Sequence, residues 1–248
     1  MWARYAGQML VVTPFAWRKG GSGFWRTRRL RLQLLRSAFL LSATVCFFAG
    51  LRYLPLAEGS AITFLAPIFV VVLSGPLLGE RPNVGRWIAT AVGFCGILLL
   101  VRPGSAVFHP AALLLLVAAL CNALFFLLTR KLVEENVHTT LFYSALVGTV
   151  VLSLLVPWQV EYSEPSPRDA LFLALGLFAG IGHWLIVSAF QHAQPSLLTP
   201  FSYLQMIWAT MYGYLIFGQL PDHWSGIGMT IIVASGLLLA LQERRRAR

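Results

Sequence analysis

The sequence predicts an all-α, polytopic membrane protein built from an inverted repeat. Of its 248 residues, 58% are hydrophobic and 11% are charged, and the mean hydropathy is +0.73. Soluble domains carry about 25% charged residues. Apolar runs of about 20 residues, the length of a membrane-spanning helix, recur along the chain. A segment near the C-terminus also repeats one nearer the N-terminus. Together these observations place the chain in a bilayer rather than in water.

The repeated segment comprises residues 189–239, which align with residues 50–99 at an offset of 139 positions, with one residue inserted after a shared proline. Each copy predicts a long apolar helix, a Gly-x-x-Pro turn and a second apolar helix. The identical pairs include Leu65 with Leu204, Ile68 with Ile207, Gly79 with Gly218, Pro82 with Pro221, Thr90 with Thr230, and Gly96 with Gly236. Weak internal symmetry in an apolar chain is typical of transporters built from repeats.

Nine transmembrane helices are predicted from the apolar runs and the Gly, Pro and charged residues between them. They cover residues 1–17, 37–54, 57–78, 87–101, 110–128, 139–158, 170–190, 195–217 and 224–241. The first is the weakest, because Arg4, Gln8 and Pro14 interrupt it. Pro67 and Pro200 fall inside predicted helices, where neighbouring helices are expected to satisfy the freed backbone groups.

The basic residues orient the chain. Residues 18–36 form a predicted loop with seven Lys or Arg residues, and a basic tail ends the sequence. With this loop inside and the helices alternating, 15 of the 19 Lys and Arg residues fall on the inner side. We therefore expect an inner or plasma membrane protein with a cytoplasmic C-terminus. The net charge of +10 then serves orientation, and nucleic acid is not an expected partner.

The helix count makes the repeat inverted. Five helices, an odd number, separate equivalent points of the two copies, so the second copy enters the membrane from the opposite face. The predicted repeats are residues 1–104 and 105–243, followed by a cytoplasmic tail at 244–248. The charges agree with this inversion. The loop at residues 159–169, which corresponds in the second copy to the basic loop at residues 18–36, carries three acids and one arginine. Inverted repeats imply a pseudo-two-fold axis in the membrane plane, with a site between the halves.

Several residues follow the pattern of a known family. They are Pro67 and Gly79-Glu80 in the first repeat, and Thr199-Pro200, Tyr203, Gln205, Gly218, Pro221-Asp222 and Gly236 in the second. With five-helix inverted repeats, they resemble the EamA family of the drug/metabolite transporter superfamily over essentially the whole chain. Gln219 departs from the pattern, since it matches Glu80 and lacks its charge.

That resemblance implies ten helices, whereas nine are predicted. Residues 1–17 resemble the family's second helix, so the first is expected to be missing. A start codon assigned too late, a truncated gene or a short variant would each explain this difference.

One face of the penultimate predicted helix suits solute binding. Phe201, Gln205, Trp208 and Tyr212 recur at spacings of four, three and four, which places them on one helical face. Aromatic walls with one amide suit a flat or amphipathic organic solute, because ligand pockets are mostly apolar with a few placed polar groups. The alternative is an interfacial aromatic belt combined with helix packing.

Two ionisable residues are candidates for proton coupling or amine binding. His183, followed by Trp184, lies in mid-span and could carry a proton, or it could be neutral and hydrogen-bonded to a carbonyl. Glu58 lies in the first turn of its helix, where it could bind an amine or a proton or pair with Arg52 at the surface. Gly176 and Gly180 form a GxxxG pair, which lets two helices approach closely.

The favoured function is a secondary transporter for a small organic metabolite, such as an amino acid, an amine or a nucleoside-like solute. It would work by alternating access around a cavity lined mainly by residues 57–78, 170–190 and 195–217. Two alternatives stay open. One is a truncated or non-transporting membrane subunit. The other is an intramembrane enzyme, which is disfavoured because His183 has no acid within its own helix.

No cofactor and no metal are expected. The three cysteines, Cys46, Cys95 and Cys121, all lie inside apolar runs without metal-ligand spacing. No Walker-type motif is present, so ATP is not expected to drive transport. The expected partners are the small-molecule solute and the lipid bilayer, and a homodimer is left open. Substrate, direction and coupling ion are not predicted.

Overall fold

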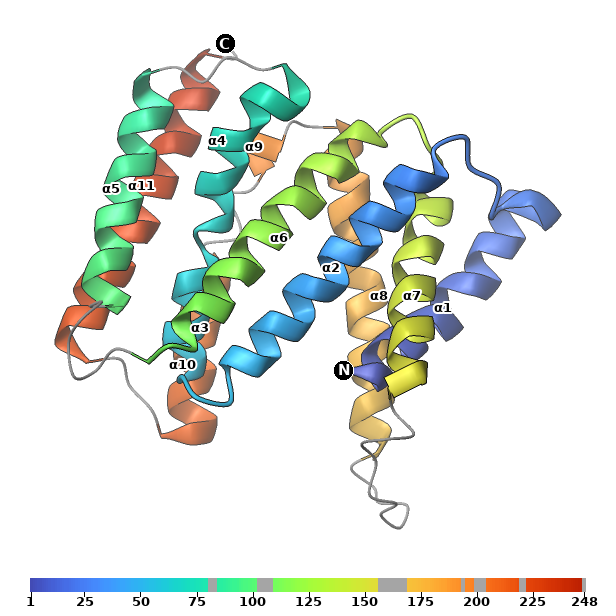
Figure 1. The fold of residues 1–248 in the computed structure, drawn as a ribbon, viewed down its shortest axis with the longest axis horizontal. Coiled ribbons are helices and arrows are strands. Elements are labelled where there is room, and N and C mark those ends of the chain that lie inside the picture. The colour runs from blue at the N-terminus through green and yellow to red at the C-terminus, as the bar shows by residue number, and fades with distance from the viewer. Residues whose placement is uncertain are drawn as a thin grey trace. The chain divides into compact units, whose positions relative to one another are not determined.

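The computed structural model of the chain describes residues 1–79, 84–101, 109–155, 169–192, 195–198, 204–218 and 222–246. The described residues form helices, turns and connections (Figure 1). The helices are α1 (Trp2–Gly20), a 3₁₀ turn η1 (Gly21–Gly23), α2 (Leu30–Gly50), α3 (Leu56–Thr63), α4 (Ala66–Leu78), α5 (Val84–Val101), α6 (Ala112–Lys131), α7 (Val137–Leu155), α8 (Asp169–His192), α9 (Pro195–Leu198), α10 (Leu204–Phe217) and α11 (His223–Arg246).

The all-helical fold confirms the predicted class. Each of the nine predicted helices has a counterpart among the described residues. The helix predicted over residues 57–78 is divided into α3 and α4, and the described parts of the helix predicted over residues 195–217 are α9 and α10. Four described segments are long and apolar enough to cross a membrane, namely Leu30–Gly50, Ala112–Lys131, Val137–Leu155 and Ala174–His192. Shorter apolar helices cover Ala66–Leu78 and His223–Leu238.

Two compact units make up the chain. Unit 1 comprises Met1–Leu41 and Leu128–His192, and unit 2 comprises Ser42–Leu127 and Ala193–Arg248. Unit 1 therefore combines one segment from each predicted sequence repeat, whereas the first segment of unit 2 crosses the predicted boundary between residues 104 and 105. Helices α1, α7 and α8 belong to unit 1, whereas α3, α4, α5, α9, α10 and α11 belong to unit 2.

Unit 2 shows the internal symmetry of the repeat. By the sequence alignment, α3 corresponds to α9, α4 to α10, and α5 to α11. Helix α3 contacts α10, the equivalent contact joins α4 to α9, and α5 packs against its own counterpart α11. In Figure 1 the chain rises through α3 and α4 and descends through α9 and α10, so the two copies run in opposite directions. These contacts are those expected of an inverted repeat.

The helix predicted over residues 57–78 is interrupted, so the prediction of one continuous span is wrong. Helix α3 ends at Thr63 and α4 begins at Ala66, with Pro67 in its first turn. Proline lacks a backbone N–H and disfavours helical geometry in the residue before it, so it suits a helix start better than an interior. The Thr63 hydroxyl donates to the Ser60 carbonyl oxygen at 2.7 Å, which satisfies one acceptor near the break.

Equivalent glycines end α4 and α10. Gly79 and Gly218, which are paired in the sequence repeat, both have positive φ angles, of 75° and 64°. Their backbone N–H groups donate to Gly75 at 2.8 Å and to Tyr214 at 2.9 Å. Glycine adopts this left-handed conformation without steric strain, and it is the common residue after a helix end. The paired glycines therefore end equivalent helices with the same backbone conformation in both copies of the repeat.

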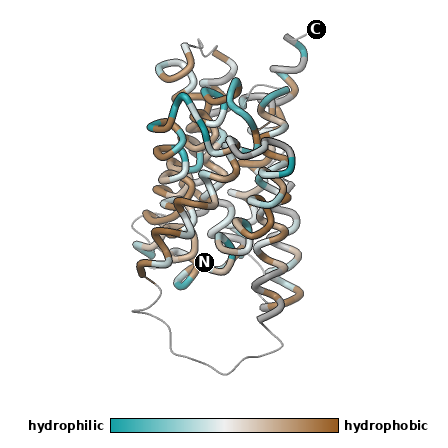
Figure 2. The backbone as a smooth tube through the Cα atoms, turned by 90° about the vertical axis from the view of Figure 1, so that its right-hand side faces the viewer, coloured by the Kyte–Doolittle hydropathy of each residue, from teal (hydrophilic) through white to brown (hydrophobic). Residues whose placement is uncertain are grey.

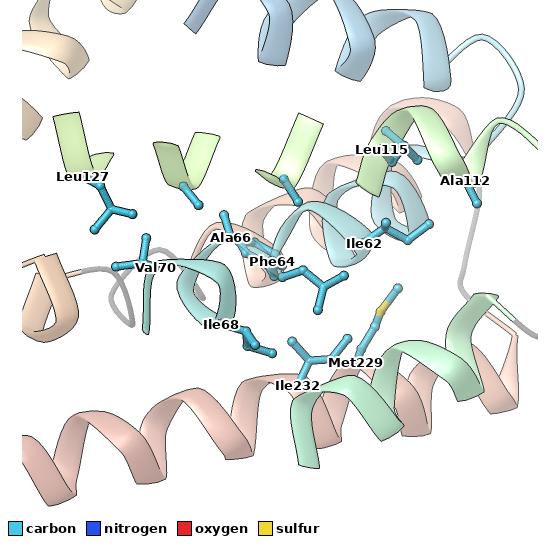
Figure 3. Packing of buried hydrophobic residues seen from close by; sticks show 13 residues of the cluster. Ile62, Phe64, Ala66, Ile68, Val70, Ala112, Leu115, Leu127, Met229 and Ile232 are labelled. Atoms are coloured by element: carbon cyan, nitrogen blue, oxygen red, sulfur yellow. The ribbon is translucent and has the colours of Figure 1, made fainter. Parts of the chain in front are cut away.

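An apolar core holds unit 2 together. Side chains of α6 face α3 and α4 from one side, and Met229 and Ile232 of α11 face them from the other (Figure 3). Leu115, Leu127 and Val70 are fully buried in this cluster. Burial of a large aliphatic side chain stabilises a fold by about 1.5–3 kcal/mol.

Helix α1 in unit 1 packs closely against α7 and α8 through glycines. A Cβ atom added at Gly176 of α8 would lie 2.6 Å from the Gly7 Cα atom, so the two backbones are in contact. The Tyr5 ring of α1 occupies the space beside Gly148 of α7. This geometry confirms that Gly176 allows a close helix approach, and Gly180 also lies beside α1.

Large apolar side chains remain exposed on many helices. Hydrophobic residues run along the helices in Figure 2. Leu154, Phe178 and Ile216 are 70%, 71% and 67% exposed. Lipid chains solvate such surfaces, whereas a monomeric soluble protein rarely exposes large continuous apolar patches.

The contact between α5 and α11 yields a stability prediction. A Cβ atom at Gly96 would lie 2.9 Å from the backbone oxygen of Gly228, whereas one at Gly226 would have no atom within 4 Å. We expect Gly96→Ala to lower the free energy of unfolding in micelles by about 1–3 kcal/mol. The matched control Gly226→Ala should be neutral or slightly stabilising. Equal stability of the two variants would contradict the backbone contact.

Candidate functional site

Unit 1 contains polar side chains buried within its helices. Two groups of residues define this buried polar cluster. The α2 group is Gln33 and Arg36 of α2 with Thr129 of α6 and Thr140 and Ser144 of α7; the α1–α8 group is Arg4 and Gln8 of α1 with His183 of α8. Ionisable residues within membrane spans are costly to bury and mark functional sites by default.

Arg36 fastens α2 to α6 and α7. Its side chain is 0% exposed. Its Nε donates to Thr129 Oγ1 at 2.6 Å, and its Nη1 donates to Ser144 Oγ at 2.6 Å. Nη1 also contacts the Thr140 carbonyl oxygen at 3.3 Å. The planar guanidinium presents several donors in a rigid fork, so one side chain can hold two helices in register.

Gln33 lies one helical turn before Arg36 and extends the same face. Its Nε2 donates to Thr140 Oγ1 at 3.1 Å, and its side chain is also 0% exposed. The prediction that residues 18–36 form a cytoplasmic loop is therefore wrong at its end, because α2 begins at Leu30. This helix start was not evident in the sequence, because three basic residues before the apolar run are typical of a loop. The spacing of three between Gln33 and Arg36 was the available signal for a polar helical face.

His183 of α8 pairs with Arg4 of α1. The Arg4 Nη2 atom lies 2.9 Å from His183 Nε2. Arginine can only donate, so Nε2 accepts and a neutral ring carries its proton on Nδ1. The sequence left a neighbouring carbonyl open as the partner of a neutral His183, whereas in the structure the Arg4 guanidinium contacts its ring. His183 itself is only 9% exposed.

Gln8 is the unusual member of the cluster. It is 0% exposed, and within the described residues neither its amide nitrogen nor its amide oxygen has a hydrogen-bond partner. Its Cγ atom lies 3.7 Å from the position of a Cβ at Gly180, so the side chain faces α8. A buried amide without partners is destabilising, and such a group in a folded protein calls for an explanation.

The structure describes part of the predicted aromatic face. The Trp208 and Tyr212 rings of α10 stack with centroids 6.1 Å apart and an interplanar angle of 25°, so these two residues do share a face. They are 54% and 46% exposed. Phe201 lies outside the described residues, and the side chain of Gln205 is not described.

The other predicted site residues belong to different units of the chain. Trp184 is 42% exposed although it adjoins the buried His183. His183 belongs to unit 1, whereas Trp208 and Tyr212 belong to unit 2. Glu58 lies in α3, but its side chain is not described. Among the residues searched, no cluster of three or more His, Cys, Asp or Glu residues could hold a metal ion.

Fold and cluster together define a class of protein. An inverted pair of helical repeats, an interrupted helix, an apolar exterior and a buried polar cluster are the features of a repeat-built membrane transporter. The EamA-like transporter family model matches residues 1–102 and 109–241. The chain therefore belongs to the EamA-like transporter family, and it is a membrane transporter of small molecules rather than an enzyme.

Characterised relatives transport different compounds. The chain is 28% identical over 243 residues to the S-adenosylmethionine uptake transporter of Rickettsia prowazekii, covering 98% of this chain and 82% of that protein. It is 27% identical over 248 residues to the riboflavin transporter of Vibrio cholerae, covering 99% of this chain and 83% of that protein. The pseudopaline exporter CntI of Pseudomonas aeruginosa is 27% identical over 204 residues, covering 81% and 71%.

A solved structure shares the fold. It superposes with a TM-score of 0.74 at 19% sequence identity, covering 100% of this chain and 88% of that chain. At this identity the likeness concerns the fold alone.

The Arg36 hydrogen bonds yield a prediction for a double-mutant cycle. Ser144→Ala removes an acceptor from a buried cation, so we expect it to lower the free energy of unfolding by about 1–3 kcal/mol. In an Arg36→Met background the same change should have little effect, because the donor is gone. Denaturant titration of the four proteins in micelles measures the coupling. Additive effects would show that the bond contributes nothing.

Proposed function

We propose that this chain moves a small organic metabolite, such as an amino acid, an amine or a nucleoside-like solute, by alternating access. The observation that carries this proposal is the inverted repeat of unit 2, in which α3 contacts α10, the equivalent contact joins α4 to α9, and α3 and α4 together form a discontinuous helix. A discontinuous helix within inverted repeats points to a transporter's binding region.

The named solutes of the relatives support the solute class. S-adenosylmethionine combines an amino acid with a nucleoside, and riboflavin has a flat aromatic ring system. These names belong to proteins 28% and 27% identical to this chain. They support a flat or amphipathic organic solute in general. The proposal assigns neither of the two named compounds to this chain.

The proposed solute contacts lie on α10. Trp208 and Tyr212 present stacked, exposed rings, and a flat solute would stack on such a surface. Phe201 and Gln205 are proposed to continue this face, and Trp184 to add an aromatic wall. His183 and Glu58 are the proposed proton or amine sites. The transport is proposed to be secondary, driven by protons or by the solute gradient.

The orientation is proposed from charge. Most basic residues fall on one side of the predicted alternating helices, which supports a cytoplasmic C-terminal tail and an inner or plasma membrane location. A homodimer remains a proposal without further support.

The aromatic pair yields a transport prediction. We expect Trp208→Ala to reduce the initial rate of solute movement by about two- to tenfold, because a lost aromatic stack weakens solute binding. The matched control is Trp87→Ala on α5, a residue similarly exposed at 53%. The measurement is a metabolite-resolved comparison of uptake and efflux between cells with and without the protein.

Three outcomes separate the alternatives in that comparison. Loss of transport in Trp208→Ala alone supports the α10 site. Equal losses in both variants, or none in either, would place solute binding elsewhere. If no metabolite changes with the wild-type chain, the proposal of transport by this chain is wrong.

The orientation yields a separate prediction. A green fluorescent protein fused after Arg248 should fluoresce, because it folds in the cytoplasm, and an alkaline phosphatase fused there should be inactive. The positive-inside bias is the physical reason. An active phosphatase fusion with a dark fluorescent fusion would reverse the topology.

A further inference from the structure

We propose that Gln8, Arg4 and His183 bind the carboxylate group of the transported solute when α1 and α8 separate. This inference rests on the proposed function and narrows its solute class. The Gln8 amide is buried, and neither its donor nor its acceptor has a partner among the described residues. The Arg4 guanidinium and the His183 imidazole lie at the same helix contact, and this juxtaposition carries the inference.

The three side chains share one helix–helix contact. Arg4 and Gln8 are four residues apart on α1, and residues four apart lie on one helical face. Gln8 faces Gly180 of α8, and His183 follows Gly180 by three residues on the same helix. The 2.9 Å contact between Arg4 Nη2 and His183 Nε2 joins the two faces directly. A group entering between α1 and α8 would therefore meet all three side chains.

The charge of the contact favours an anion. The positive charges of Arg4 and Arg36 both act on the His183 ring. The acidic side chains that the structure describes in unit 1, Glu134 and Glu135, lie in the connection between α6 and α7. A guanidinium binds a carboxylate through a planar, often two-bonded arrangement. The amide nitrogen of Gln8 can donate a further hydrogen bond to the same group.

The Gln8 amide has no hydrogen-bond partner among the described residues, and this distinguishes the site from a contact that serves only helix packing. Gln33 is as deeply buried as Gln8, but its amide nitrogen donates to Thr140 across the α2–α7 contact. Gln8 makes no such bond to the described residues, so it adds nothing to helix packing that an apolar residue could not supply. A buried polar group retained without a structural bond is explained by a ligand that completes it.

Access to Gln8 requires a change in the helix contact. The side chain is 0% exposed, and the Gly7 and Gly176 backbones touch beside it. Glycines leave no interlocking side chains at this point, so the two helices can part without breaking side-chain packing there. Opening and closing of this contact would expose and enclose the carboxylate, as alternating access requires.

The test measures the carboxylate preference of the purified full chain. Thermal shifts are recorded with methionine and methioninamide, with S-adenosylmethionine and its decarboxylated form, and with riboflavin, which has no carboxylate. The proteins are wild type, Gln8→Leu, Gln8→Glu and the matched control Gln33→Leu. Uptake of the same compounds into proteoliposomes by the wild type is measured separately.

We expect the wild type to prefer a compound that has a carboxylate over its counterpart that lacks one. Gln8→Leu should reduce that preference about tenfold or more, since hydrogen bonds to charged groups are strong, without lowering the unfolding temperature of the empty protein. Gln8→Glu should abolish it by charge repulsion. Gln33→Leu should lower the unfolding temperature and keep the preference.

Other results overturn the inference. A preference unchanged in Gln8→Leu, or a destabilised empty Gln8→Leu protein, would assign Gln8 a structural role. Uptake of riboflavin, or of the counterparts that lack a carboxylate, without carboxylate preference would overturn the site but leave the proposed transport function intact. No uptake and no thermal shift with any compound would overturn both.

Discussion

Hydrogen bonding in the absence of water is the constraint on which this structure depends. The lipid interior offers no donors or acceptors, so buried polar groups must find partners inside the protein. Arg36 donates hydrogen bonds to Thr129, Thr140 and Ser144, and it thereby joins the parts of α2, α6 and α7 that lie in unit 1. A charged residue that would destabilise an isolated membrane-spanning helix thus links neighbouring helices of the bundle. The same requirement makes the buried amide of Gln8 conspicuous.

Small residues allow apolar helices to associate in an apolar solvent. Lipid provides little hydrophobic drive for association, so close packing must provide the attraction. Glycines let α1 touch α8 in unit 1 and let α5 touch α11 in unit 2. Unit 2 combines such contacts with the divided helix α3–α4, whereas unit 1 combines them with a polar cluster. A transporter needs both properties, since contacts that lack interlocking side chains can open.

Much of the fold could be predicted from the sequence, because hydropathy and internal symmetry report directly on membrane helices. The paired glycines Gly79 and Gly218 show this well, since they match in the alignment and end equivalent helices with the same backbone geometry. The start of α2 was missed, because a basic run is typical of a loop and the spacing of Gln33 and Arg36 is a weak signal without their tertiary partners. The partner of His183 lies 179 residues away in the sequence, beyond any local pattern. Of the predicted aromatic face, only the Trp208–Tyr212 stack is described.

Alternating access is the central claim, and exchange across a membrane tests it most directly. Proteoliposomes holding the chain are preloaded with an unlabelled solute that the chain takes up, and the initial uptake of the labelled solute is measured. Alternating access predicts faster uptake into preloaded vesicles than into empty ones, because the loaded carrier returns across the membrane faster than the empty one. Uptake that is unchanged or slowed by preloading, and that does not saturate with solute concentration, would indicate a pore and contradict the account.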